Sequence, residues 1–333
     1  MMSLCYVAVL LLSAPVDGPG LSDGMAVELK ALEARQALRN GVVELSVETL
    51  KLEGPPGLRF DDRPVDLKIS FDGPRRFVES CRQGQGRPQI ERRMFDGSLY
   101  VVEHGDDRSE RLVIDSHGYA GSRQFVLNPQ LLGVYPGSAL VFGSKSLETV
   151  LGRTDRTEEQ VRTEQMSGRA VTHVSRKVSS GQLQVDLWIA PELNYSVVRV
   201  EVHSTPARSE LVCEYDQPFG NIWFPRRTTY RQHMSPDDRL TNEEVVTVKS
   251  AVFNRGIDPS LFTLAAFKPV VGDIVRQDGA QMAWNGKHLV SADDATVATL
   301  KSRSLIGNWP WFTVAVFLAI AAFVILRRSF VRP

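Results

Sequence analysis

Apolar and polar residues alternate strictly in several stretches of the chain, which is the pattern of a β-strand with one buried face. The clearest stretch is 65–72, where four apolar residues alternate with four polar ones: Val65, Leu67, Ile69 and Phe71 with Asp66, Lys68, Ser70 and Asp72. One apolar face and one wet face predict an antiparallel sheet. Further strands are expected at 43–47, 75–82, 90–95, 98–104, 111–115, 170–177, 183–189, 196–202, 211–215, 223–233 and 244–253.

The segment that precedes the first strand has the period of a helix. Between residues 23 and 40, one apolar stripe follows spacings of four, three and four: Val27, Ala31, Ala34 and Leu38. A second apolar stripe lies on the opposite side: Met25, Leu29 and Leu32. Asp23 can cap the start of this helix and Gly41 its end. The pattern therefore predicts one helix covered on two faces, followed by a long antiparallel meander.

Turn residues and breaks in the pattern divide the rest of the chain. Asp72-Gly73 and Asp96-Gly97 are hairpin signals between strand-like runs. Residues 124–168 interrupt the strand rhythm, and 146–151 fit one or two helical turns. Beyond the main domain, small hairpins are expected around two further turn signals, Asp278-Gly279 and Asn285-Gly286.

The two ends of the chain indicate a membrane protein. Residues 4–14 are apolar and have the length of a signal-peptide core, although they lack a basic start. Residues 309–326 carry no charge, are flanked by Trp309 and Trp311, and are followed by arginines. They can cross a hydrocarbon core of about 30 Å, and a buried core helix is the alternative. The expected organisation is a signal peptide at 1–20, a main domain at 21–265, a β-hairpin extension at 266–293, a juxtamembrane linker at 294–308, a transmembrane helix at 309–326 and a cytoplasmic tail at 327–333.

This topology predicts a single-pass cell-membrane protein whose main domain is extracytoplasmic, which means periplasmic in a bacterium with two membranes. The chain has 39 basic and 39 acidic residues among 333, so it lacks the positive charge that a nucleic-acid-binding protein uses to displace counterions. No nucleic-acid partner is expected.

Motifs of known chemistry are missing from the sequence. It contains no zinc-type CxxC or HExxH, no GxSxG elbow and no GxxxxGK[ST] phosphate loop. His173 and His203 occupy strand positions that favour the solvent-facing side of the sheet. The sequence therefore predicts a protein that is not an enzyme and that has no cofactor and no metal site.

Two cysteines remain once the signal segment is set aside, Cys81 and Cys213, and both lie in strand-like runs. In an oxidising compartment they can form a disulfide. Two separate buried thiols are the alternative, because sequence alone does not place them side by side.

An ordered series of motifs between 183 and 264 resembles the C-terminal half of the outer-membrane lipoprotein-sorting proteins, the LolA/LolB-like superfamily. The stretches are "LQVDLWIAPELNYSVVRVEV", "CEYDQPFGNIWFPRRTTY" and "VKSAVFNRGIDPSLFTL". The matching positions are Trp188, Ile189 and Pro191; Val198, Arg199 and Val200; Gly220, Trp223, Phe224 and Pro225; and Asn254, Ile257, Asp258 and Phe262. The first half, with "FDGPRRF" and "FDGSLYVV", is also similar, so the resemblance covers about residues 25–265. One departure is that two residues, rather than one, separate Gly220 from Trp223.

The resemblance implies a mainly β (α+β) fold, an antiparallel half-open β-barrel whose opening is plugged by helices. It also implies an apolar cavity for lipid chains, with four candidate lining residues: Leu67, Ile69, Phe71 and Trp223. The expected function is binding of a lipid or lipid-modified protein, as a local carrier or acceptor in envelope lipoprotein handling. The alternatives are an envelope sensor or interaction module that contacts a membrane protein partner, and a face filled by the protein's own side chains.

Overall fold

The structure is a computed structural model that describes residues 22–52, 63–82, 88–103, 112–115, 128–137, 151, 156–178 and 183–293. The predicted signal peptide, linker, transmembrane helix and tail lie outside the described residues, as does 146–150 of the predicted helical turns. Among the residues that are described, no helix combines the length and apolar character needed to cross a membrane.

The single α-helix of the described residues is α1 (Asp23–Gln36). Its N-cap is Ser22, whose Oγ accepts a hydrogen bond from the Met25 amide at 3.3 Å, rather than the predicted Asp23. The helix ends at Gln36, before the predicted residue 40. Its buried residues form a stripe that contains two charges: Gly24, Glu28, Ala31, Leu32 and Arg35. Ala31 of the first predicted stripe and Leu32 of the second are buried, and Val27 and Leu29 pack partly buried against the core, whereas the two charged residues were not predicted.

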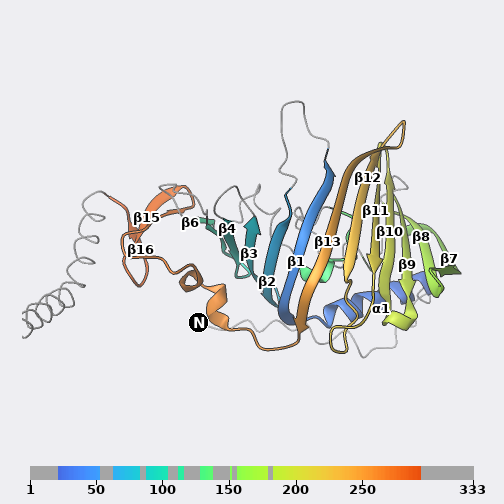
Figure 1. The fold of residues 1–333 in the computed structure, drawn as a ribbon, viewed down its shortest axis with the longest axis horizontal. Helices are drawn as coiled ribbons and strands as arrows, with labels where there is room; N and C mark the ends of the chain where they lie inside the picture. The colour runs from blue at the N-terminus through green and yellow to red at the C-terminus, as the bar shows by residue number, and fades with distance from the viewer. Residues whose placement is uncertain are drawn as a thin grey trace, which may run out of the picture.

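The described residues form sixteen strands of one sheet, in the order β16-β15-β14-β6-β5-β4-β3-β2-β1-β13-β12-β11-β10-β9-β8-β7 (Figure 1). The strands are β1 (Asn40–Leu52), β2 (Val65–Asp72), β3 (Arg75–Arg82), β4 (Gln89–Phe95), β5 (Tyr100–Glu103), β6 (Leu112–Asp115), β7 (Arg156–Met166), β8 (Arg169–Val178), β9 (Leu183–Ala190), β10 (Ser196–Ser204), β11 (Ala207–Glu214), β12 (Arg227–Met234), β13 (Arg239–Phe253), β14 (Ile274–Gln277), β15 (Ala280–Trp284) and β16 (Leu289–Ser291). Neighbouring strands are antiparallel except β14 and β6, which are parallel. The sheet is open, since β16 and β7 are its two edges.

Register places the alternating apolar residues on one shared face. Val43 of β1 pairs with Ile69 of β2, and Leu45 pairs with Leu67. All four side chains are buried, and cross-strand partners point to the same side of a sheet. The opposite side is wet, as the Glu44–Lys68 ion pair at 3.2 Å shows. The alternation predicted from the sequence is confirmed for these strands.

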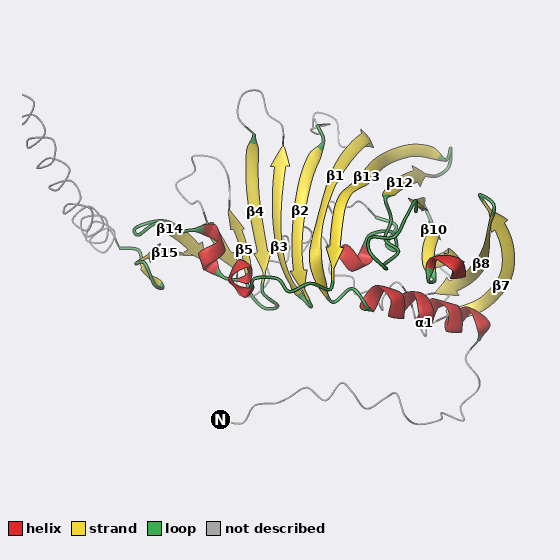
Figure 2. Cartoon of the chain, turned by 60° about the horizontal axis from the view of Figure 1, so that its bottom comes forward, coloured by secondary structure: helices red, strands yellow, loops and turns green. Residues whose placement is uncertain are grey.

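This apolar face, here called the covered face, is closed by helical segments. Helix α1 lies across it at β7, β9 and β10 (Figure 2). The 3-10 helix η1 (Pro129–Leu131) and the turn that follows it add Leu131, Leu132 and Val134 to the same core. The mainly β fold with a helix-covered apolar face is confirmed, but the strands form one open sheet that is not closed into the predicted half-open barrel.

A second core lies on the other face of the sheet. Phe77 of β3 pairs with Ser70, so it points away from Ile69 and Phe71. Phe77 contacts Phe267 at 5.8 Å between ring centroids, and the short helices η4 (Pro259–Phe262) and η5 (Leu264–Phe267) cover this part of the sheet. Residues 266–293 form the two predicted hairpins, and β14 joins them to the main sheet through β6.

Two strand predictions need correction. Strand β7 lies within residues 124–168, where no strand was predicted, because its sequence is almost entirely polar and charged. Charged residues are typical of an edge strand, where they discourage pairing with another chain. Strand β12 begins at Arg227 rather than at Trp223, which leaves Trp223, Phe224 and Pro225 in the preceding loop.

Candidate ligand-binding face

The four predicted lining residues meet in one core beneath the sheet. Leu67, Ile69 and Phe71 are 7%, 0% and 1% exposed, and Trp223 is partly buried against the same cluster. Phe71 contacts the ring of Phe253 at 6.4 Å between centroids. The structure therefore brings the predicted residues together and covers them with the protein's own side chains. A ligand that reaches them must displace part of this cover.

Helix α1 is held to the sheet by a buried ion pair in addition to its apolar side chains. Glu28 of α1 and Arg176 of β8 are both 0% exposed, and Arg176 Nε donates to Glu28 Oε1 at 2.9 Å. At the start of the helix, Gly24 lies so close to β7 that an added Cβ would be 2.9 Å from Val161 Cγ2. The contact of α1 with the sheet thus combines small residues with buried charge.

A second buried charge lies nearer the end of α1. Arg35 Nη2 donates to the hydroxyl of Tyr215 at 3.1 Å, and that hydroxyl donates to the carbonyl oxygen of Val197 at 2.8 Å. The Arg35 guanidinium also lies 5.4 Å from the centroid of the Phe224 ring. Burial raises the pKa of Tyr215, so its hydroxyl stays protonated. Arg35 and Tyr215 therefore form a second polar contact inside the core, in addition to the Glu28–Arg176 ion pair.

Two neighbouring aromatic residues in the loop before β12 differ in burial, since Phe224 lies in the core and Trp223 at its rim. Phe224 is fully buried, with its ring 4.9 Å from that of Phe253 and 6.4 Å from that of Phe219. Trp223 stays partly exposed at the border of the same cluster. Sequence reasoning chose Trp223 and missed Phe224, Glu28, Arg35 and Arg176. The only sequence signal for the three charged residues was their position at helix and strand spacings usually taken by apolar residues.

The predicted disulfide is wrong, because Cys81 and Cys213 are free thiols far apart in the sheet. Cys81 lies on β3 and Cys213 on β11, with β2, β1, β13 and β12 between them. At about 4.8 Å per strand this is a separation of roughly 24 Å, whereas bridged Cα atoms lie within about 7 Å. The alternative of two separate buried thiols holds for Cys213, which is buried, whereas Cys81 is partly exposed.

The buried thiol of Cys213 makes stability depend on alkaline pH. Burial raises its pKa from 9.0 to about 12, so the unfolded chain loses this proton first. The free energy of unfolding that the neutral thiol contributes is present below pH 9 and is lost as pH rises towards 12. We expect the wild type to lose roughly 1 kcal/mol more than Cys213→Ala between pH 9 and 10, measured by urea unfolding. Equal losses in the two proteins would contradict this burial.

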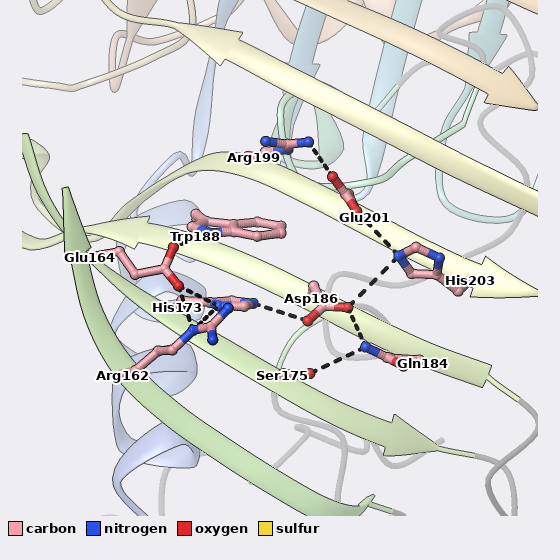
Figure 3. Close-up of polar contacts among 10 residues, drawn as sticks. All are labelled: Arg162, Glu164, His173, Ser175, Gln184, Asp186, Trp188, Arg199, Glu201 and His203. Atoms are coloured by element: carbon pink, nitrogen blue, oxygen red, sulfur yellow. Dashed lines mark hydrogen bonds and ion pairs between the residues drawn. The ribbon is translucent and has the colours of Figure 1, made fainter. Parts of the chain in front are cut away.

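The outward face of β7–β10 carries a polar network (Figure 3). The ring of Trp188 stacks on His173 at 4.2 Å with an interplanar angle of 8°, and Arg199 lies 5.0 Å over its other side. His173 Nε2 is 3.0 Å from Asp186 Oδ1, and His203 Nε2 is 3.2 Å from Glu201 Oε2. His203 is on the solvent-facing side as predicted, but His173 is 5% exposed because its neighbours cover it.

The contacts within this network are those of side chains that stabilise the sheet. Its histidines bond to carboxylates and to Arg162, and in the described residues neither ring bonds to a hydroxyl or thiol nucleophile. Beside it, a polar hollow of about 390 Å³ is lined among others by Lys177, Gln184, His203, Arg208, His233 and Asp238. Arg208 Nη2 donates to Asp238 Oδ2 at 2.9 Å across this hollow, so its charges largely satisfy one another.

The fold places the chain among mainly β proteins built on an open, helix-covered sheet. No family model matches the chain, and no curated protein matches it. Two structures of PNGF-II, in space groups P21 and C2, are each 10% identical to it, with TM-scores of 0.17 and 0.18. They cover 68% and 79% of this chain, which spans 30% and 33% of the PNGF-II chains, about a third of their length.

A further similar structure is the complex of MucA and MucB from Pseudomonas aeruginosa. It is 7% identical, covers 71% of this chain and 100% of that chain, and has a TM-score of 0.21. Likenesses this distant carry no argument about activity or partners. The specific resemblance to lipoprotein-sorting proteins therefore stays a prediction from the sequence motifs.

Proposed function

We propose that this protein binds the hydrocarbon chain of a lipid, or of a lipid-modified protein, on the covered face of its sheet. The observation that carries the proposal is the continuous apolar face of β1 and β2, with Val43, Leu45, Leu67, Ile69 and Phe71 buried side by side. Transfer of each methylene from water to such a face is favourable by about 0.8 kcal/mol. A lipid chain that replaces part of the cover keeps these side chains out of water.

The composition of the cover supports this exchange. The side of α1 that faces the sheet offers Ala31 and Leu32 as its buried apolar residues, beside Gly24 and two charged side chains. Val27 and Leu29 of α1 pack against the same core but stay partly exposed, so each contributes less hydrophobic free energy than a fully buried side chain. An acyl chain that replaces part of this cover gives the sheet the apolar contact that those side chains supplied.

The predicted membrane anchor indicates where in the cell this lipid binding takes place. If residues 309–326 hold the domain at the extracytoplasmic surface of a membrane, a lipid can pass between bilayer and sheet without diffusion of the protein. This favours a local carrier or acceptor over a carrier that travels between membranes. The protein has no catalytic role in this proposal.

Replacing Trp223 by leucine is expected to weaken lipid binding about five- to tenfold, because a large apolar side chain is lost from the rim of the covered face. Binding of a polarity-sensitive fluorescent fatty acid to the full chain in amphipol measures the change. Trp284→Leu is the matched control, because Trp284 is also partly exposed but lies on β15, outside the core cluster against which Trp223 packs, and this variant should keep the wild-type affinity.

The absence of saturable binding by the wild type would contradict the proposal, and so would equal losses in both variants. Crosslinking in native membranes adds a separate outcome. A stoichiometric protein partner, captured from a protein that carries no lipid, would favour the interaction-module alternative.

A further inference from the structure

Arg35 is a charged side chain placed inside the covered face with unused hydrogen-bonding capacity. The residue is 3% exposed, and its one side-chain hydrogen bond in the described residues runs from Nη2 to Tyr215 at 3.1 Å. The second terminal nitrogen, Nη1, is buried and has no hydrogen-bond partner among the described residues. Buried polar groups are nearly always bonded, so this nitrogen requires a physical explanation.

The surroundings of Arg35 are neutral. Tyr215 and Phe224 contact the guanidinium, and no ion pair joins it to a carboxylate of the described residues. Arg176, buried in the same core, has the carboxylate of Glu28 at 2.9 Å. A buried guanidinium without a counter-anion is costly, because it has lost the solvation that water supplied. The core around Arg35 is therefore short of one negative charge.

We infer that Arg35 and Tyr215 bind the oxyanion of the ligand, either the carboxylate of a fatty acid or the phosphate of a phosphorylated lipid. This inference rests on the proposed function and names the chemical class of its ligand as an anionic amphiphile. Guanidinium matches the geometry of carboxylate and phosphate oxygens and forms strong, charge-assisted hydrogen bonds with them. The Tyr215 hydroxyl, which now donates to Val197, can turn its proton to the same oxyanion.

Within the described segment 128–137, Gly133 lies against Arg35. Gly133, with φ +81°, lies where an added Cβ would be 3.3 Å from Arg35 Nη2 and 3.0 Å from Pro225 Cγ. Its carbonyl oxygen accepts a bond from the thiol of Cys213 at 3.3 Å, and thiols are weak donors. Gln130 Nε2 donates to the carbonyl oxygen of Leu38 at 2.9 Å. An anionic head that displaces Gly133 reaches Arg35 directly.

Three ligands with the same 18-carbon chain test the inference: oleate, oleyl phosphate and oleyl alcohol. Each competes with the fluorescent fatty acid for the full chain in amphipol. We expect at least one of the two anions to bind about 10- to 100-fold more tightly than the neutral alcohol, as hydrogen bonds to a charged group imply. Which anion binds more tightly identifies the source of the oxyanion.

Arg35→Gln should abolish the preference for the anion, so that the anions and oleyl alcohol bind this variant with affinities within about twofold of one another. Tyr215→Phe, which keeps the buried ring, should reduce only the anion affinity by about three- to tenfold, and it decides the matter if Arg35→Gln does not fold. A wild type without preference, or a preference that survives both substitutions, overturns the inference while the proposed function stands. If none of the three ligands binds, the proposed function itself fails.

Discussion

Glu28→Leu will lower the free energy of unfolding by about 3–5 kcal/mol, the largest effect that we expect from one substitution in α1. The substitution removes the carboxylate that faces Arg176 at 2.9 Å, where both side chains are 0% exposed. A buried guanidinium deprived of this partner keeps its desolvation cost and loses the compensating attraction. Urea unfolding of the full chain, followed by far-ultraviolet circular dichroism, measures the change.

The double variant Glu28→Leu, Arg176→Met is the control for this prediction. Replacing a buried ion pair by apolar side chains of similar volume is often neutral or stabilising, so the double variant should recover most of the stability lost by Glu28→Leu. Losses that simply add in the double variant would show that the two side chains do not act as a pair. A small effect of Glu28→Leu alone would contradict the burial of the pair.

Phe224→Ala will lower the free energy of unfolding by about 3–5 kcal/mol, because it empties a fully packed site. The Phe224 ring is 0% exposed and contacts Phe253 at 4.9 Å and Arg35 at 5.4 Å. Trp223→Ala is the matched control in the adjacent position. Since Trp223 is only partly buried, its substitution should cost less than half as much while it weakens lipid binding.

Thermal and urea unfolding of Trp223→Ala and Phe224→Ala distinguish a core residue from a residue at the rim. Equal destabilisation by Trp223→Ala and Phe224→Ala would mean that Trp223 belongs to the core rather than to the rim. The division of the two side chains between core and rim would then be wrong, and Trp223 would lose its role as a ligand contact.

Strict alternation made β2 and its partners predictable. The residues at 65, 67, 69 and 71 are all apolar, and a shift by one residue would bury Asp66 and Lys68 instead. The hairpins of 266–293 were predictable because Asp278-Gly279 and Asn285-Gly286 are strong turn signals. In these segments the local pattern alone determines which side chains face inward.

Other elements follow from contacts that a single segment does not reveal. Strand β7 has no apolar alternation, and its pairing with β8 organises it. The buried stripe of α1 contains Glu28, whose partner Arg176 is 148 residues away. A search for periodically spaced apolar residues does not identify such a buried charged residue, because only the distant partner makes its burial possible.

The candidate site likewise contains residues that were predictable from the sequence and residues that were not. Leu67, Ile69 and Phe71 were identified from their alternation, whereas Arg35 was not, because one arginine in a helix usually faces water. Arg35 acquires its place from Tyr215 and Phe224, which contact it although Tyr215 is 180 residues further along the chain. The apolar part of the site was predictable from the sequence and the polar part was not.

Photo-crosslinking with a diazirine-bearing fatty acid tests the central claim, that the covered face binds a lipid chain, most directly. The full chain in amphipol is irradiated with the probe, and the labelled peptides are mapped by mass spectrometry. The account predicts labels on 65–71 and around Trp223, competed away by excess oleate. Labels confined to 309–326, or to the outward network around Trp188, would contradict it.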